Sequence, residues 1–158
     1  MSNYVNLSQT FIKNEQTSEL QDQFILELNK AVNTVQGKTF EITFQVGSLM
    51  ISGTLIGGHE YYKEIIKQLH NSKKDTITSC PIDDYIKKAI AYYSQENKST
   101  SDIFTVLHAR DAKFYPENNI SNTTGPSVWR GRASCIDGFM LGRWNHEKEN
   151  QNSVSPTD

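Results

Sequence analysis

Apolar side chains recur with helical spacing near the start of the chain. They fall on one face of a helix and are followed by Gly37. A glycine in the left-handed conformation commonly ends a helix. The members of this stripe are Leu20, Phe24, Ile25, Leu28, Ala31, Val32 and Val35. The pattern predicts an amphipathic helix from Ser18 to Val35.

The next segment alternates between apolar and polar positions. KTFEITFQV places its apolar residues on one side of an extended chain, which is typical of a half-buried strand. Gly47-Ser48 predicts a tight turn, and LMISGTLI (residues 49–56) predicts the return strand. Gly53 inside that strand indicates a bulge or a sharp bend, so we expect a strongly bent hairpin.

Two further helical stripes predict a helical insertion between the second and third strands. The first begins after Gly57-Gly58 and carries Tyr61, Tyr62, Ile65, Ile66 and Leu69, with a loop from His70 onward. The second begins at Pro81, which suits the first turn of a helix, and carries Ile82, Tyr85, Ile86, Ala89, Ile90 and Tyr93. We expect these aromatic residues to serve packing rather than ligand binding.

The last third of the chain returns to the alternating pattern. Residues 103–115 predict a third strand, and the turn-forming residues of 116–127 predict an exposed, mobile loop. VWRGRASCIDGFMLG (residues 128–142) predicts a strand through Ala133, a kink near Asp137-Gly138 and a short last strand. Together these elements predict an α+β fold, with about five antiparallel strands in a strongly bent sheet or a small barrel.

Length and charge narrow the class of protein. The 158 residues, of 18.0 kDa, suit a single domain, which we place at 17–143 between a flexible N-terminus (1–16) and a disordered polar tail (144–158). The formal charge of −2 provides no overall basic field for nucleic acid or acidic lipid. Without a spanning apolar run or the layout of a signal peptide, we expect a cytoplasmic protein that makes no membrane contact.

Candidate reactive side chains are scattered along the chain. The four histidines lie on different predicted elements, and none has a cysteine or carboxylate at metal-ligand spacing. Cys80 and Cys135 are expected to be buried thiols, and no G-x-S-x-G elbow occurs. We therefore expect no metal, no cofactor and no enzymatic activity. His108 is interpreted as a half-exposed packing residue on the face of Arg110, and catalysis there is kept as an alternative.

The most specific local feature is the run Trp129-Arg130-Gly131-Arg132. Guanidinium groups beside an aromatic ring can bind phosphate and stack on bases, so a local nucleic-acid contact is one interpretation. On a strand, both arginines share one face and Trp129, Gly131 and Ala133 share the other, so a solvated face is a second. Ion pairs to Asp111, Asp137 or Glu41 are a third.

Three segments carry a family resemblance: ISGTLIGGHEYY (51–62), VLHARDAKFY (106–115) and VWRGRASCIDGFMLG (128–142). They resemble the gas-vesicle accessory protein U family, which has an ISGT-x-I strand before an EYF-like helix, an HL-x-x-A-K-like strand and a WRG-x-x-x-x-VDGF-x-LG ending. The resemblance covers Phe40 to Gly142. It departs in the long N-terminal helix, in the helix from Pro81, and at His108-Ala109, where the family pattern has His-Leu.

The residues that match this pattern in order are Ser52, Gly53, Thr54, Glu60, Tyr61, Trp129, Arg130, Gly131, Asp137, Gly138, Phe139, Leu141 and Gly142. A fainter resemblance is to Sm-like small barrels, because SGTLIGG, HARDAKFY and VWRGRASCI occur in the order of their signature strands. The asparagine that Sm-like rings use for RNA has no clear counterpart.

The first resemblance implies a non-enzymatic accessory protein that acts in assembly, maturation or clustering of gas vesicles, through contacts with vesicle proteins or with a second copy in a homo-oligomer. We expect a partner-binding face that contains Trp129, Arg130, Arg132 and Phe139. Structural roles are expected for Gly53, Gly131, Gly138 and Asp137, and Gly53 and Gly138 should resist substitution. The alternative function is an Sm-like nucleic-acid-binding module that uses Arg130 and Arg132.

Overall fold

The computed structural model describes residues 22–72, 81–94, 103–116 and 128–144. In chain order these form α2 (Gln23–Thr34), β1 (Phe40–Val46), β2 (Leu49–Ile56), α3 (Gly58–Ser72), α4 (Pro81–Ser94), β3 (Val106–Pro116), β4 (Trp129–Arg132) and β5 (Gly138–Leu141). A 3-10 turn, Ala133–Cys135, follows β4. The predicted N-terminal segment 1–16, the loop at 117–127 and the tail beyond 144 lie outside the described residues.

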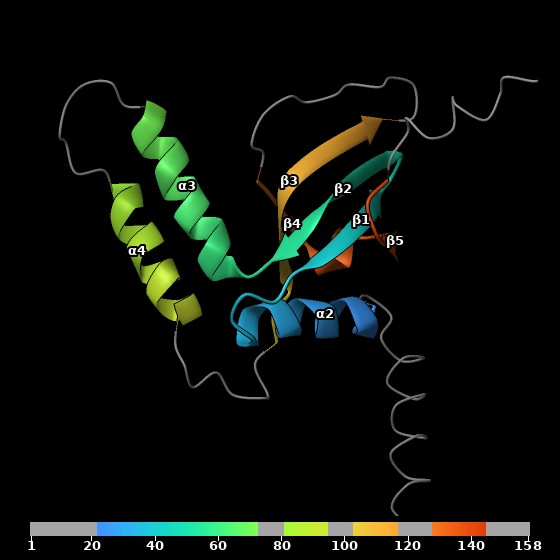
Figure 1. Cartoon of the computed structure of the whole chain (residues 1–158), viewed down its shortest axis with the longest axis horizontal. Coiled ribbons are helices and arrows are strands. Elements are labelled where there is room, and N and C mark those ends of the chain that lie inside the picture. Colours follow the sequence, from blue (N-terminus) through green and yellow to red (C-terminus); the bar gives the residue numbers. More distant parts are fainter. Residues whose placement is uncertain (1–21, 73–80, 95–102, 117–127, 145–158) are drawn as a thin grey trace, which may run out of the picture.

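The strands form one antiparallel sheet in the order β4-β3-β2-β1-β5, which confirms the predicted α+β class (Figure 1). β1 and β2 pair without a register break around the tight turn at Gly47. The consecutive strands β4 and β5 lie at opposite edges and do not pair with each other among the described residues. The sheet is therefore open, and the closed Sm-like barrel is not formed by this part of the chain.

A bulge interrupts the pairing of β2 with β3. Asp111 and Ala112 both stand opposite the single residue Gly53, and Asp111 has a φ of 51°. A Cβ on Gly53 would lie 2.9 Å from the backbone oxygen of Arg110, so only glycine allows the two strands to approach this closely. The predicted irregularity at Gly53 is confirmed, although the extra residue lies in β3.

α2 covers the apolar side of the sheet and lies below the strands in Figure 1. A carboxylate oxygen of Asp22 accepts hydrogen bonds from the N–H groups of Phe24 and Ile25, at 2.8 and 3.1 Å, and so caps the helix. The main members of the core are Ile25, Leu28, Val32, Ile42, Phe44, Ile51, Leu55, Leu107 and Ala109. The amphipathic helix is confirmed from Gln23 onward; residues 18–21 are outside the described part.

Two buried asparagines connect α2 to neighbouring elements. The Nδ2 of Asn29 donates to the carbonyl oxygens of Phe104 and Val106, at 2.7 and 2.9 Å. The Oδ1 of Asn33 accepts from the N–H of Gly58 at 2.9 Å, at the first residue of α3. Because Asn29 and Asn33 are polar residues on the buried face of α2, a search for apolar positions alone did not reveal that this helix also positions α3 and the start of β3.

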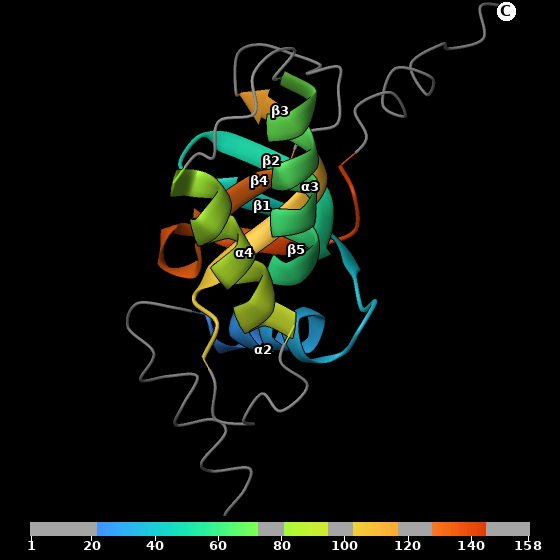
Figure 2. The same cartoon turned by 90° about the vertical axis from the view of Figure 1, so that its left-hand side faces the viewer.

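The helical insertion between β2 and β3 is confirmed as α3 and α4. They pack side by side and stand in front of the strands in Figure 2. Tyr62 and Ile86 are buried in this pair, and a Cβ on Gly58 would meet the ring of Tyr93 at 2.5 Å. α3 extends to Ser72, past His70, where a loop was expected.

Candidate functional site

β4 is one edge of the sheet and contains the run from Trp129 to Arg132. Its register pairs Arg130 with His108 and Arg132 with Val106. Residues directly opposite each other share a face, so both arginines project on the face of His108, against which α3 packs. Trp129 and Gly131 project on the core face. The predicted separation of the arginines from Trp129 is confirmed.

The four arginines of the chain divide into two kinds. The Nη1 of Arg110 lies 3.5 Å from the Oε2 of Glu60, and Arg143 contacts the carboxylate of Glu41. By contrast, Arg130 and Arg132 are exposed, and no carboxylate of the described ranges lies within ion-pair distance of either. Arg130 and Arg132 are therefore positive charges of β4 that no described carboxylate neutralises, and we call them unneutralised.

The carboxylates that were predicted as their partners are used elsewhere. Glu41 contacts Arg143, and a carboxylate oxygen of Asp111 lies 3.8 Å from the Nη2 of the same arginine. The Oδ2 of Asp137 accepts a hydrogen bond of 2.5 Å from the N–H of Gly47, in the turn between β1 and β2. For the described residues, the ion-pair interpretation of Arg130 and Arg132 is therefore wrong.

Trp129 is half-buried and packs on the core from the side opposite the arginines. Its ring centroid lies 5.4 Å from that of Phe44, and the two planes are inclined by 33°. A Cβ on Gly131 would lie 2.3 Å from the Trp129 ring, so the absence of a side chain at Gly131 makes room for the indole. Trp129 thus supports β4 from the core face of the sheet.

Phe139 also packs toward the core, but from β5, at the opposite edge of the sheet from Trp129. Its ring stacks on Phe24 of α2, with centroids 5.9 Å apart, and it packs against the core. At Gly138 a Cβ would meet only the Oε1 of Gln45, at 3.9 Å, and the φ is not positive. The structure therefore provides no steric reason for glycine at position 138, in contrast to Gly53 and Gly131.

His108 lies beneath a cluster of tyrosines from α3 and α4. Its ring is fully buried, with its centroid 4.5 Å from Tyr61, 5.9 Å from Tyr93 and 6.1 Å from Tyr62. Neither ring nitrogen has a hydrogen-bond partner in the described structure. The expectation of a half-exposed histidine is wrong, because the helical insertion covers this end of the sheet.

Burial sets the protonation of this cluster. It lowers the pKa of His108 to about 3, with a further lowering by the positive charge of Arg130, so the imidazole is neutral at pH 7. Burial raises the pKa of Tyr61 and Tyr93, and raises that of Tyr62 to about 12, while Arg130 opposes each rise. The positive charge of Arg130 thus acts on every ring of this neutral cluster.

A family model described as gas vesicle protein GvpU-like matches residues 22–144. The chain belongs to this family. The match runs from the cap of α2 to the last described residue, so it covers every helix and strand that the structure describes. The GvpU-like family is a gas-vesicle accessory family, and the resemblance predicted from the sequence is confirmed. No curated protein and no solved structure matches the chain.

The GvpU-like chain also has a polar strap that the sequence did not reveal. After β5, the segment Gly142 to Trp144 crosses the polar face of the sheet. The backbone N–H of Trp144 donates to the hydroxyls of Thr43 and Ser52, at 3.1 and 2.8 Å, and the Nη2 of Arg143 donates to Thr54 at 2.6 Å. These three hydroxyl residues are buried, and their alternation along β1 and β2 was the available signal.

Among the described residues no group of three or more His, Cys, Asp or Glu side chains is arranged to hold a metal ion. Within those same ranges, none of the helices combines the length and the hydropathy that crossing a membrane requires. Cys135 is exposed rather than buried, because it lies in the 3-10 turn at the sheet edge; Cys80 is outside the described part.

Proposed function

We propose that the chain is a non-enzymatic accessory protein that acts in the assembly, maturation or clustering of gas vesicles through protein–protein contacts. The observation that carries the proposal is the GvpU-like match over residues 22–144, which spans the whole described fold. It works in the cytoplasm, at the vesicle surface, and binds a vesicle protein.

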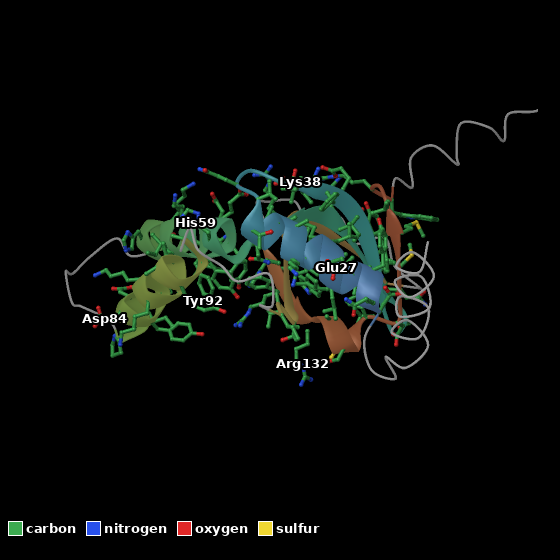
Figure 3. The ribbon with its side chains drawn as sticks, turned by 90° about the horizontal axis from the view of Figure 1, so that it is seen from below. Glu27, Lys38, His59, Asp84, Tyr92 and Arg132 are labelled. Atoms are coloured by element: carbon green, nitrogen blue, oxygen red, sulfur yellow. The ribbon has the colours of Figure 1, made fainter. Side chains whose placement is uncertain are left out.

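The partner-binding surface that we propose lies around β4. Arg130 and Arg132 supply unneutralised positive charge, and Trp129 supports the strand from the core side. Tyr85 and Tyr92 of α4 are about half exposed, at 54% and 53%. Figure 3 shows Tyr92 and Arg132 extending to the same side of the molecule. Arginine and tyrosine are the side chains that most often dominate the binding energy of an interface, which supports this assignment.

A homo-oligomer is the second part of the proposal, and β5 is the edge that suits it. Met140 and Leu141 are exposed apolar residues on that strand, at 47% and 59%. Pairing of two β5 edges would cover these side chains and satisfy the outward backbone groups of β5, with which no described strand pairs. Pairing of two β4 edges would instead bring four arginines together.

Light scattering tests the oligomer. It should give a mass above 18 kDa at micromolar concentration, and Met140→Lys should restore the mass of the monomer. A wild-type mass of 18 kDa would refute the oligomer.

Deletion and complementation in a gas-vesicle-producing host test the accessory role. We expect deletion to change the number of vesicles per cell or their clustering, as seen by electron microscopy, and the wild-type gene to restore both. Arg130→Gln/Arg132→Gln should fail to complement, whereas the matched double change Lys38→Gln/Lys63→Gln, at exposed positions away from β4 and α4, should complement. Vesicles that are unchanged after deletion would remove the proposed function.

Nucleic-acid binding remains the second candidate function, favoured by the exposure of Arg130 and Arg132 beside tyrosines. Such binding would weaken steeply with salt, because each arginine–phosphate contact releases counterions. Retention of single-stranded RNA at low salt that is lost in Arg130→Ala would support it. An absence of retention at low salt would exclude it.

A further inference from the structure

Within the described residues, the outer edge of β4 has backbone groups without a strand partner at two particular residues. The N–H of Ala133 donates to the carbonyl oxygen of Thr105 at 2.8 Å, so the backbone of Ala133 faces β3. Backbone direction alternates along a strand, so Gly131 also faces β3, whereas the N–H and C=O groups of Arg130 and Arg132 point outward. Among the described strands, none pairs with that edge.

The same two residues carry the unneutralised guanidinium groups. Arg130 and Arg132 are two positions apart on one face, which separates their Cα atoms by about 7 Å. Side-chain carboxylates at alternate positions of an extended chain have the same spacing. A strand that added to this edge would therefore pair its backbone with the outward groups of both arginines and could place two carboxylates beside their side chains.

We propose that the β4 edge binds an extended acidic segment of a partner protein by strand addition, with Asp or Glu at two alternate positions opposite Arg130 and Arg132. The residue between the two carboxylates lies over Gly131, where an apolar side chain meets the Trp129 ring that covers this glycine. The expected recognition sequence is acidic–apolar–acidic in an extended conformation. This inference deepens the proposed function and rests on it for the identity of the partner as a vesicle protein.

Two other occupants fit this edge less well. A nucleic acid offers phosphates to the guanidinium groups but no row of N–H and C=O groups for the outward backbone, and the chain as a whole carries a charge of −2. The β5 edge of a second copy, GFML, can supply backbone groups but contains no carboxylate. An acidic peptide strand satisfies both the backbone and the charges.

Binding of a synthetic peptide to the full chain tests the proposal. The probe is a fluorescein-labelled ten-residue peptide with Glu-Val-Glu at its centre and threonines on either side, followed by fluorescence anisotropy. We expect saturable binding that weakens about tenfold in Arg130→Gln and again in Arg132→Gln, since a charge-assisted hydrogen bond contributes on that scale. Lys38→Gln/Lys63→Gln, which removes two positive charges from exposed positions away from β4 and α4, should leave binding unchanged.

Two control peptides separate strand addition from simple charge attraction. A peptide with Glu-Glu-Val places its carboxylates on opposite faces, and a Glu-Val-Glu peptide with N-methylated backbone at both glutamates cannot donate to the edge. Both should bind at least about tenfold more weakly. Equal binding of all three peptides, or arginine-dependent binding of a 20-nucleotide RNA without peptide binding, would overturn the proposal. Flotation with vesicles can still succeed in that case, so the two proposals fail independently.

Discussion

Gly53 lies where β2 and β3 approach most closely, and the structure predicts a cost for any side chain there. The Cβ of alanine would meet a backbone oxygen at 2.9 Å and the Cα of Ala112 at 3.3 Å, and neither belongs to a flexible side chain. Gly53→Ala should lower the free energy of unfolding by about 1–3 kcal/mol, measured by urea denaturation.

Gly138→Ala is the matched control for this change. It places the same methyl group in a strand where, among the described residues that are not its chain neighbours, one side-chain oxygen at 3.9 Å is the only atom within 4 Å. We expect the urea midpoint to stay within about 0.5 kcal/mol of wild type, or to rise slightly because alanine restricts the unfolded chain. Equal destabilisation by the two substitutions would contradict the role assigned to the bulge.

His108 makes the stability of the fold depend on pH in a defined window. Its folded pKa of about 3 is below the unfolded value of 6.5, so the unfolded chain binds a proton first as the pH falls. This contribution is fully present above pH 6.5 and is lost progressively toward pH 3. Between pH 6.5 and 4.5 the loss is about 2 kcal/mol, which thermal or urea unfolding would measure.

Substitution separates this effect from the titration of carboxylates. The groups that face the imidazole are Tyr61, Tyr62, Tyr93 and Arg130, and none of them changes charge in this window. His108→Phe should flatten the pH dependence between 6.5 and 4.5, whereas the exposed control His70→Gln should keep the wild-type slope. An unchanged slope in His108→Phe would show that another group carries the dependence.

In the candidate site, the sequence predicted only those features that follow from the two-residue period of a strand. A period of two placed Arg130 and Arg132 on one face and Trp129 on the other, as observed. Which carboxylates neutralise which arginines depends on register and on the bulge at Asp111, and neither follows from local pattern. The burial of His108 depends on tyrosines more than ten residues away in sequence.

At the scale of elements, the segment after β5 connects β1, β2 and β3 on the polar face of the sheet. Arg143 contacts Glu41, Thr54 and Asp111, which belong to three different strands. Arg143→Gln should lower the free energy of unfolding by about 1 kcal/mol, a figure reduced for the partial exposure of the guanidinium. Urea denaturation at low salt would measure it, and part of the effect should disappear at 1 M salt.

Arg132→Gln is the matched control, because it removes an arginine that has no carboxylate partner in the described structure. Its urea midpoint should equal that of wild type. If Arg143→Gln were as neutral as Arg132→Gln, the strap would contribute nothing to stability, and the hydrogen bonds from the Trp144 backbone would have to be tested separately.

The elements themselves were largely predictable, because each has a clear hydrophobic period. The hairpin of β1 and β2 and the helix α4 lie where the pattern placed them, whereas α3 continues past His70 and the chain turns at Ala133–Cys135, before the kink expected near Asp137-Gly138. The pattern did not predict that β4 and β5 lie at opposite edges, since strand order depends on long-range pairing. Nor did it reveal Asn29 and Asn33, whose contacts connect residues far apart in the chain.

For the whole molecule, the distribution of charge matters more than its sum. The formal charge is −2, yet Arg110 and Arg143 are neutralised by carboxylates while Arg130 and Arg132 are not. A nearly neutral protein can therefore present a small positive edge, next to the tyrosines of the helical insertion. That edge is the surface through which we expect the protein to reach a gas vesicle.

Co-flotation tests this account most directly. Purified protein is mixed with purified gas vesicles and centrifuged, and the floating layer is assayed against an unrelated soluble protein. We expect the wild-type protein and Lys38→Gln/Lys63→Gln to rise with the vesicles, and Arg130→Gln/Arg132→Gln to remain largely below. Wild-type protein that stays in solution with the control would contradict the accessory role.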